Sequence, residues 1–333
     1  MRDEDADLRS RDAPSPHHGR LWPATDMAVQ IPLFVVAEAA GAGSCEVLST
    51  KPGQRRVVRY SMPDGRAVIG KSFADPERAQ RLWDIHAALC SAGLSVPRLV
   101  GPRPTPTEHG SSLVTYEAAD GALLESLLAT ATAPSLVARA GRWLAQLHDT
   151  RIAVERVFDL AVEMANIATW AREVGTLHPA VEQRAVKLAD AVAARAKILE
   201  LSATTVVHKD FHAGHVLIGV DVVVIDLDEV RLGDPSFDVG HFLAYLQLAA
   251  WRNAVIDERL GELSQAFSDG YVERGGTLSP YKVRWAQAYT FVKIARQLAL
   301  GIGVAPCPTG TERGRQIELA LTCGEVCVAA DHS

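Results

Sequence analysis

The 333-residue sequence has few features of exported, membrane-bound or nucleic-acid-binding proteins. Its five cysteines are scattered and odd in number, which argues against a disulfide framework. It has no apolar run near the roughly 20 residues of a membrane helix, and no apolar leader follows a basic N-terminus. A net charge of −6 supplies no basic field for nucleic acid or an anionic membrane. We therefore expect a cytoplasmic protein whose partner is a small molecule, with neither nucleic acid nor a membrane as a partner.

Residues 1–28 also lack apolar periodicity. They are rich in charge and contain proline, so they offer little apolar surface to offset the entropy lost on ordering. We predict a disordered tail here.

Strand-like segments dominate the part of the chain that follows. CEVLST (45–50), RRVVRYSM (55–62) and RAVIGKSF (66–73) are rich in β-branched residues. The Pro63-Asp64-Gly65 turn joins the last two, and Asp-Gly tolerates the positive φ of tight hairpins. These three segments predict antiparallel strands.

A helix and a further strand complete this region. Asp75 can cap the helix that Pro76 begins, apolar residues recur at helical spacing, and the pattern stops at Gly93. SLVTYE (112–117) predicts another strand.

Beyond residue 122 the composition changes to long segments rich in alanine and leucine, such as 136–148 and 160–173. This change predicts an α+β protein of two lobes: a β-rich lobe at 29–116, a hinge at 117–121 and a helical lobe at 122–333.

One island of different texture, residues 204–243, interrupts the helical lobe. Its short β-branched strands are separated by polar turns that contain Asp210, His215 and, eleven residues further on, Asp226. Phosphoryl transfer requires a carboxylate that orients the acceptor oxygen and a second carboxylate, with another ligand, that holds Mg²⁺. Asp210 suits the first task, and Asp226 and His215 suit the second, although imidazole is a poorer Mg²⁺ ligand than oxygen and His215 could instead contact phosphate.

Three histidines, His208, His212 and His215, also raise the alternative of a zinc site. Val206 and Val207 before them and Gly214 among them argue against a continuous helix, and the HExxH pattern is absent. We expect His208 to pack and to hold the loop by hydrogen bonds.

Lys71 lies within an apolar strand, where an ammonium needs an anionic partner. We expect it to hold the α- and β-phosphates of ATP. An acid on the following helix would pair with it, and Asp84 is preferred over Glu77 because it lies nearer the middle of that helix.

Two further segments are candidates for nucleotide binding. The turn that contains Gly53 offers backbone N–H groups to phosphates, and Thr115, Glu117 and Ala118 offer backbone groups to an adenine edge. Asp238, in the sequence that opens the next helix, is expected to cap that helix or to hold the backbone of the Asp210 loop.

The segments HKDFHAGHVL (208–217), VVVIDLDE (222–229) and GDPSFDVGHFL (233–243), with VIGK and LAQLH upstream, resemble the aminoglycoside phosphotransferase and choline kinase-like family. The resemblance spans residues 45–300. It implies a protein-kinase-like fold and phosphorylation of a small-molecule hydroxyl with ATP and Mg²⁺ or Mn²⁺. It also implies that Asp210 is the catalytic aspartate, Asp226 a metal ligand and Lys71 the phosphate lysine.

The sequence departs from the family pattern at two positions. His215 stands where an asparagine metal ligand is usual, and a histidine at this place resembles the motif of macrolide phosphotransferases. Lys209 replaces a common glycine. We predict a small-molecule kinase, with a catalytically silent nucleotide-binding protein as the alternative. Aminoglycoside, macrolide, sugar and amino-alcohol acceptors all stay open, as do the oligomeric state and a role in antibiotic resistance or in metabolism.

Overall fold

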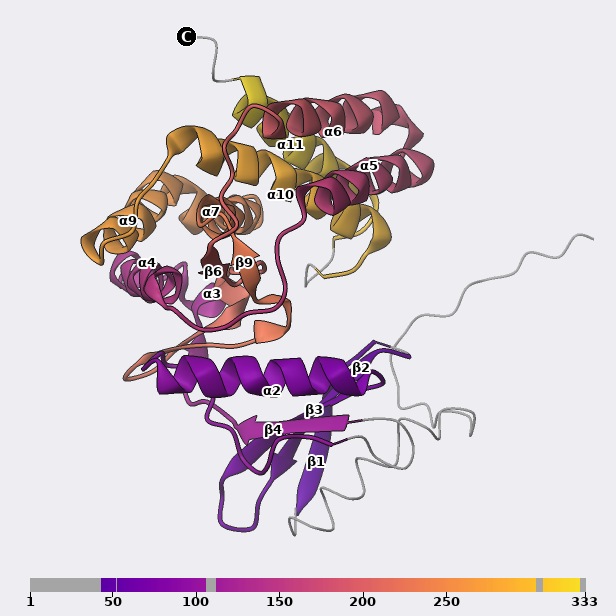
Figure 1. Ribbon diagram of the computed structural model, residues 1–333. Coiled ribbons are helices and arrows are strands. Elements are labelled where there is room, and N and C mark those ends of the chain that lie inside the picture. Colours follow the sequence, from indigo (N-terminus) through magenta and orange to yellow (C-terminus); the bar gives the residue numbers. More distant parts are fainter. Residues whose placement is uncertain (1–42, 52, 106–111, 304–307, 330–333) are drawn as a thin grey trace, which may run out of the picture.

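The computed structural model describes residues 43–51, 53–105, 112–303 and 308–329. The predicted tail at 1–28 and the beginning of the predicted first lobe, residues 29–42, lie outside the described residues. The four-stranded sheet and one helix, α2 (Pro76–Ser91), form one end of the molecule, and a larger, mostly helical part forms the other end (Figure 1). The predicted two-lobed α+β architecture is confirmed.

A four-stranded antiparallel sheet forms the smaller lobe, in the order β1-β2-β3-β4. Its strands are β1 (Ser44–Lys51), β2 (Arg55–Ser61), β3 (Ala67–Phe73) and β4 (Ser112–Glu117). The predicted hairpin turn closes β2 onto β3: Gly65 has a φ of +85° and its N–H donates to Met62 O at 3.0 Å. The strand predictions in this region are confirmed.

Helix α2 (Pro76–Ser91) packs against this sheet and lies between it and the helical lobe (Figure 1). The Asp75 carboxylate caps the helix by accepting the Glu77 N–H at 3.0 Å. Ala79, Leu82, His86 and Leu89 form its buried face. Full burial of a side chain such as Leu89 contributes about 2 kcal/mol to folding, so the face of α2 is fixed by its apolar spacing.

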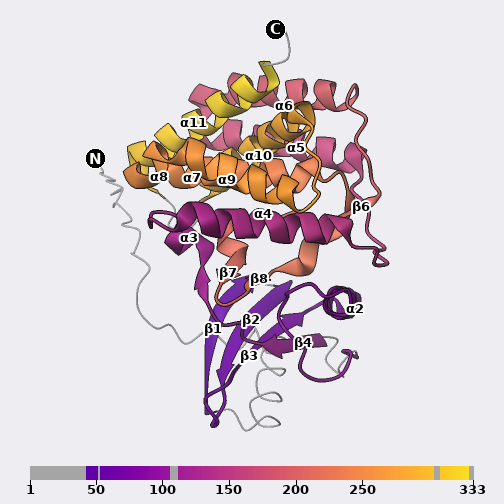
Figure 2. The ribbon, with the colours of Figure 1, turned by 90° about the vertical axis from the view of Figure 1, so that its left-hand side faces the viewer.

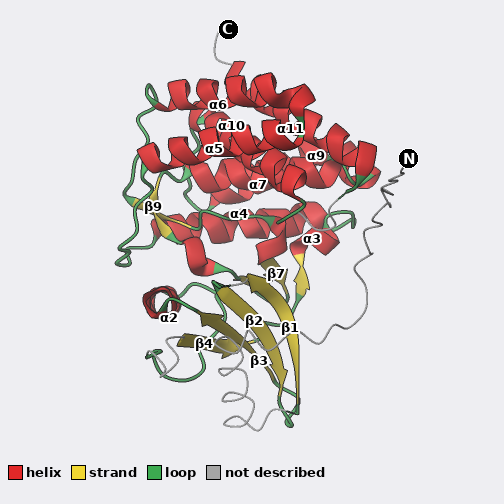
Figure 3. Cartoon of the chain, turned by 90° about the vertical axis from the view of Figure 1, so that its right-hand side faces the viewer, coloured by secondary structure: helices red, strands yellow, loops and turns green. Residues whose placement is uncertain are grey.

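The larger lobe is mostly helical (Figures 2 and 3). Its helices are α3 (Leu124–Leu127), α4 (Ala133–Asp149), α5 (Leu160–Leu177), α6 (Glu182–Ala196), α7 (Ser236–Ala250), α8 (Ala254–Glu258), α9 (Leu260–Glu273), α10 (Pro280–Leu300) and α11 (Gly310–Ala329). Helix α10 packs against α5, α6, α7 and α11, so it is the central helix of the lobe. Among the described residues, no helix has the length and apolar character needed to cross a membrane.

Short strands position the polar segment 204–243 close to the smaller lobe. β5 (Ala122–Leu123), β7 (Val216–Ile218) and β8 (Val222–Val224) form one small sheet, and β6 (Thr205–Val207) pairs with β9 (Arg231–Gly233). The four-stranded sheet ends with β4, and the next strand along the chain, β5, already pairs with β7. We accordingly propose that the lobes meet at 118–121.

Candidate active site

The loop after β6 carries Asp210, and its backbone is held by one buried carboxylate. Asp238, in the first turn of α7, accepts the N–H of His208 at 2.6 Å and the N–H of Lys209 at 2.7 Å. His148 Nε2 lies 3.1 Å from Asp238, and His148 Nδ1 lies 2.8 Å from the Tyr271 hydroxyl. The expected support of the loop by Asp238 is confirmed.

Burial alone would raise the pKa of Asp238, but the bond to His148 and the loop N–H groups lower it below the ordinary value. Asp238 is therefore ionised when the loop is formed. A charged acceptor makes both backbone hydrogen bonds stronger than neutral ones, so α7 and the Asp210 loop are joined firmly.

Lys209 occupies a left-handed backbone conformation with a φ of +73°. This conformation favours glycine, which explains how the family pattern can carry glycine there. The Lys209 ammonium lies over the rings of Phe158, Phe237 and Tyr289, at 5.3, 4.7 and 5.2 Å, and 3.1 Å from Glu163. Burial lowers the pKa of Lys209 to about 8, although Glu163 opposes the shift. The aromatic and carboxylate contacts stabilise the lysine in this strained position.

The Asp210 carboxylate faces a cation from the centre of the helical lobe. Lys293 Nζ, on α10, donates to Asp210 Oδ1 at 2.6 Å, and His241 Nε2, on α7, lies 3.1 Å from the same oxygen. Burial would raise the pKa of Asp210, but Lys293 and the histidines hold it well below its usual range. Asp210 is thus an ionised carboxylate whose Oδ1 is occupied by protein groups.

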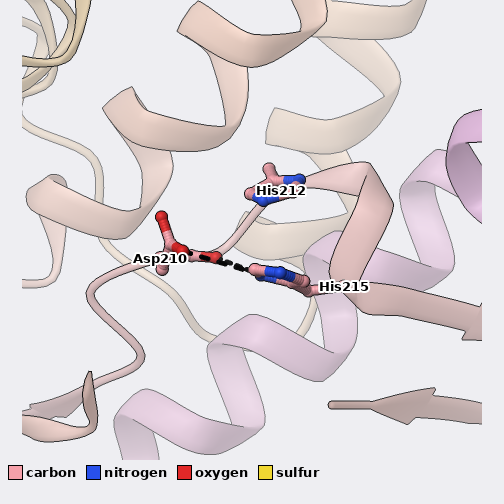
Figure 4. Close-up of side chains that lie close together, drawn as sticks. All are labelled: Asp210, His212 and His215. Carbon is pink, nitrogen blue, oxygen red and sulfur yellow. Dashed lines mark hydrogen bonds and ion pairs between the residues drawn. The ribbon is translucent and has the colours of Figure 1, made fainter. Parts of the chain in front are cut away.

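Three side chains of this loop converge: ligand atoms of Asp210, His212 and His215 lie within 4.8 Å of one another (Figure 4). His215 Nδ1 bonds the Asp210 carbonyl oxygen at 2.8 Å, which fixes the ring relative to the loop. Asp210 in this cluster also accepts the hydrogen bond from Lys293.

His208 is fully buried and does not join this cluster. Its Nε2 lies 3.1 Å from Ile225 O, and its Nδ1 accepts the Asp210 N–H at 3.3 Å. Both ring nitrogens are engaged within the loop. The expected packing role of His208 is confirmed, and these contacts argue against a zinc site that uses it.

Asp226 follows β8 and faces both the other lobe and the Asp210 loop. Its backbone has a φ of +60°, an uncommon conformation for a residue other than glycine. Lys71 Nζ, on β3, donates to Asp226 Oδ1 at 2.6 Å, Arg55 Nη1 donates to the same oxygen at 3.2 Å, and His215 Nε2 lies 3.6 Å from Oδ2. The structure therefore links Lys71, Asp226, His215 and Asp210 through consecutive contacts across the lobes.

Burial would raise the pKa of Asp226, but Lys71, His215 and Arg55 lower it strongly. Lys71 and Arg55 also bond the carboxylate of Asp228, which is only 2% exposed. Two carboxylates thus lie just after β8, and cations from the smaller lobe contact both.

The expected pairing of Asp84 with Lys71 is wrong. Asp84 accepts two hydrogen bonds from Arg103, each 2.8 Å long, and the alternative, Glu77, lies 3.4 Å from Arg81. Leu82 and His86 point into the core, so the residue between them on the helix points to solvent. Helix α2 instead directs a cation toward the site, because Arg78 Nη2 lies 3.6 Å from Asp228 Oδ2.

The adenine-binding role expected of Thr115, Glu117 and Ala118 stays a prediction. The N–H of Glu117 donates to Arg98 O at 2.8 Å and the N–H of Ala118 donates to Ala67 O at 2.9 Å, so these two donors are already used. Thr115 likewise accepts the Val100 N–H at 2.9 Å. Gly53 lies in the β1–β2 turn with a φ of +66°, as a tight turn requires, and its role toward phosphate stays a prediction.

The donor set at the end of β8 fits Mg²⁺. Asp226 and Asp228 supply hard carboxylate oxygens, which Mg²⁺ prefers, and Lys71 and Arg55 supply the positive charge that such a pair needs in the absence of a dication. His215 lies against Asp226 as a nitrogen donor. These residues would hold the ion together with phosphate oxygens and water.

A cavity of about 480 Å³ lies on the other side of Asp228, between α2, residues 153–156 and residues 227–230. Asp228 and Arg78 line it, but Asp210, Asp226 and Lys71 do not. This cavity is consequently distinct from the contacts that link the two lobes through Lys71 and Asp226.

Sequence reasoning missed Asp228, Arg55, His241 and Lys293. Asp228 repeats the acid of Asp226 two residues on, which was a usable signal. Lys293 lies in the apolar run TFVKIA, the same signal that singled out Lys71. Arg55 and His241 have no comparable mark in the sequence, because the place of Arg55 depends on how the lobes meet and that of His241 on how α7 packs against the Asp210 loop.

The geometry agrees with comparisons to known proteins. The model of the phosphotransferase enzyme family matches residues 49–276. No curated protein sequence matches the chain.

Two solved structures illustrate the likeness in fold. A spectinomycin phosphotransferase in complex with ADP and spectinomycin has a TM-score of 0.63 and 12% identity, and the match covers 90% of this chain and 98% of that one. An amicoumacin kinase in complex with AMP-PNP and Ca²⁺ has a TM-score of 0.61 and 16% identity, with 90% and 93% covered.

A third example is a thermostable mutant of an aminoglycoside phosphotransferase in a ternary complex with ADP and hygromycin B. Its TM-score is 0.61 and its identity 14%, and the match covers 91% of this chain and 99% of that chain. At these identities the likeness is one of fold.

Proposed function

The chain belongs to the phosphotransferase enzyme family, and from that premise we propose that it transfers the γ-phosphoryl group of ATP to a hydroxyl of a small molecule. The acceptor belongs to the alcohols that include aminoglycosides, macrolides, sugars and amino alcohols. The related structures support nucleotide use, since they contain ADP or AMP-PNP beside hydroxylated antibiotics. Cytoplasmic action fits this proposal, because ATP and Mg²⁺ are available there.

Asp210 is the proposed catalytic residue. Its Oδ1 is held by Lys293 and faces His241, which leaves Oδ2 to accept a hydrogen bond from the acceptor hydroxyl. As the hydroxyl oxygen bonds to the γ-phosphorus, the bond from that phosphorus to the β–γ bridging oxygen breaks and ADP leaves. The hydroxyl proton passes to Asp210. Because the transition state is loose, orientation matters more than basicity, so the low pKa of Asp210 is compatible with this role.

The proposed nucleotide side comprises Lys71, Asp226 and Asp228, with His215 between the two halves. Lys71 contacts the α- and β-phosphates once it is released from the aspartates, and Gly53 and the 115–118 segment lie along the nucleotide. Asp226 and Asp228 would hold Mg²⁺ or Mn²⁺, which would supply positive charge to the phosphates. Asp84 is assigned to the surface with Arg103.

The observation that carries the proposal is the continuous set of contacts from Lys71 through Asp226 and His215 to Asp210. Lys71 and Asp226 lie on different lobes, with 2.6 Å between Nζ and Oδ1. His215 then touches both loops, at 3.6 Å from Asp226 Oδ2 and 2.8 Å from the Asp210 carbonyl oxygen. Phosphate, metal and acceptor sites are thereby adjacent, as in-line transfer requires.

The test replaces Asp210 with alanine and measures phosphate transfer to a panel of alcohols by mass spectrometry. General base and orientation effects are worth roughly 10²- to 10⁴-fold, so Asp210→Ala should lower kcat by that factor while AMP-PNP binding is retained. Asp221→Ala removes an exposed aspartate from the same region and serves as the control. Nucleotide binding without transfer to any alcohol would instead indicate a catalytically silent protein.

A further inference from the structure

The proposed function uses Lys293 only to hold one oxygen of Asp210, but its charge also bears on the acceptor. It lies on α10 between residues that face the core, and its ammonium is 2.6 Å from Asp210 Oδ1. The side chains of Lys293 and Asp210 are 21% and 27% exposed, so both reach the surface from which an acceptor must approach. The pKa of Lys293 is raised above its usual value: burial opposes this, but Asp210 outweighs it. The cation is therefore permanent.

The other carboxylates on the helical side of Asp210 have partners of their own. Glu163 contacts Lys209 and Arg231, Asp238 contacts His148 and the loop N–H groups, and Glu229 contacts Arg156 and Arg231. Tyr289 also donates a hydrogen bond to Glu163.

The ring of His241 also faces this oxygen, with Nε2 at 3.1 Å from Asp210 Oδ1. Burial lowers the pKa of His241 to about 4, so this ring adds little positive charge. A further carboxylate, Glu125 on α3, is exposed; its Oε2 lies 3.0 Å from the position a Cβ on Gly214 would occupy. The charged group in direct contact with the Asp210 carboxylate is therefore Lys293.

An ammonium group of the acceptor, next to the hydroxyl that reacts, would lie close to the Lys293 ammonium. The Asp210 carboxylate is already bonded to Lys293 and would not neutralise a second cation fully. Two like charges about 6 to 12 Å apart, at an effective dielectric constant of about 20, repel enough to change an equilibrium by roughly 100- to 10-fold. A neutral hydroxyl is not repelled, and a carboxylate nearby is attracted. We propose that Lys293 determines the charge preference of the acceptor site, and that the acceptor presents its hydroxyl from a part of the molecule that is uncharged or anionic. This inference rests on the proposed phosphotransferase function.

The test compares matched acceptors that differ in charge. Glucose, glucosamine and gluconate provide neutral, cationic and anionic forms of one skeleton, and spectinomycin and hygromycin B extend the panel to larger amines. Phosphorylated product is quantified by mass spectrometry for the wild type, Lys293→Met, Lys293→Gln and Lys293→Arg. Lys282→Met is the matched control, because Lys282 lies on the same helix and pairs with an aspartate, Asp234, at 3.1 Å.

The wild type should phosphorylate neutral and anionic acceptors at least tenfold better, in kcat/KM, than their cationic counterparts. Lys293→Met and Lys293→Gln should lower the rate on neutral acceptors and narrow that ratio by about tenfold, since a neutral side chain no longer repels an ammonium. Lys293→Arg and Lys282→Met should keep the wild-type ratio. A merely structural role of Lys293 would lower all rates alike and leave the ratio unchanged.

The inference is overturned if cationic acceptors are preferred by the wild type, or if both neutral variants, folded by circular dichroism, keep the wild-type ratio. Either outcome leaves the kinase function intact. If the wild type binds AMP-PNP but phosphorylates no acceptor, the proposed function fails and the inference fails with it, so the two failures are distinguishable.

Discussion

The two carboxylate centres of the site are neutralised in different ways. Asp226 and Asp228 receive their cations, Lys71 and Arg55, from the β-sheet of the smaller lobe. Asp210 receives Lys293 from α10, within the same lobe as its own loop. One centre is therefore completed only when the lobes meet, whereas the other is complete inside the helical lobe.

This difference separates an adjustable half from a fixed half. A relative movement of the lobes changes the cations at Asp226 and Asp228, and these cations must move if a metal ion is to bind. The Asp210 loop is instead held by Asp238 and His148, which are buried in the helical lobe. We expect nucleotide and metal to alter the first half and the acceptor to meet a preformed second half.

The comparison would break most visibly at Asp226. Asp226→Asn removes the charge that the proposed metal site depends on, so kcat/KM should fall by about 10³-fold or more and metal-dependent AMP-PNP binding should be lost. Titration calorimetry with and without Mg²⁺ measures the binding. Because Asp210→Ala is expected to retain that binding, equal loss of metal dependence in both variants would contradict the separation of the two halves.

The rigidity of the acceptor half can be tested through Asp238. Asp238→Asn replaces a charged acceptor of two loop N–H bonds, which should let the Asp210 loop shift. Misplacement of this kind costs on the order of 10- to 100-fold, so kcat should fall by that factor. The Kd for AMP-PNP, measured in the same titration, should stay within about twofold of the wild type. A matching rise in that Kd would show that Asp238 serves both halves.

Much of the fold could be predicted because its signals are local. The Pro63-Asp64-Gly65 turn, the Asp75 cap and the alternation in 112–117 depend on neighbouring residues only, and the structure has all three. The Asp210 loop could be predicted for the same reason, since its strands and turns are contiguous in the sequence.

Contacts between residues far apart in the sequence were harder to predict. Asp84 and Arg78 are both polar residues of α2, and the sequence pattern alone does not say which of them lies near Lys71 and its partners. The way in which the buried face of α2 packs places Arg78 near Asp228 and leaves Asp84 with Arg103. Arg55 and Lys293 reach their carboxylates over separations of 171 and 83 residues. The one signal for Lys293 in the sequence was the presence of a lysine within an apolar run.

Removal of Arg55 should sharpen the comparison from the metal side. Arg55→Gln takes away one of the cations that compete with a dication for Asp226 and Asp228, so Mn²⁺ should bind about three- to tenfold tighter in the absence of nucleotide. Paramagnetic titration with Mn²⁺ measures this. Arg59→Gln, an exposed position of the same strand, is the control. Unchanged Mn²⁺ affinity would show that Arg55 does not hold the aspartates in solution.

The last expected effect is on stability, not on the site, and concerns the smaller lobe alone. His86 is 2% exposed, stacks on Tyr116 with ring centroids 5.3 Å apart and lies 3.4 Å from Pro97 O through Nδ1. Burial lowers the pKa of His86 from its ordinary 6.5 to about 4, with Lys71 adding to the shift and Pro97 opposing it.

Between these two pKa values His86 is neutral in the folded protein, whereas the histidine of the unfolded chain binds a proton. The free energy of unfolding should therefore fall as pH drops from about 6.5 toward 4. Between pH 7 and pH 5 this contribution is about 2 kcal/mol, and His86→Leu, which cannot titrate, should lose that much less than the wild type in urea unfolding. Equal losses in both proteins would mean that His86 is protonated in the folded state, and that the sheet side of the cleft is more open to water than its burial indicates.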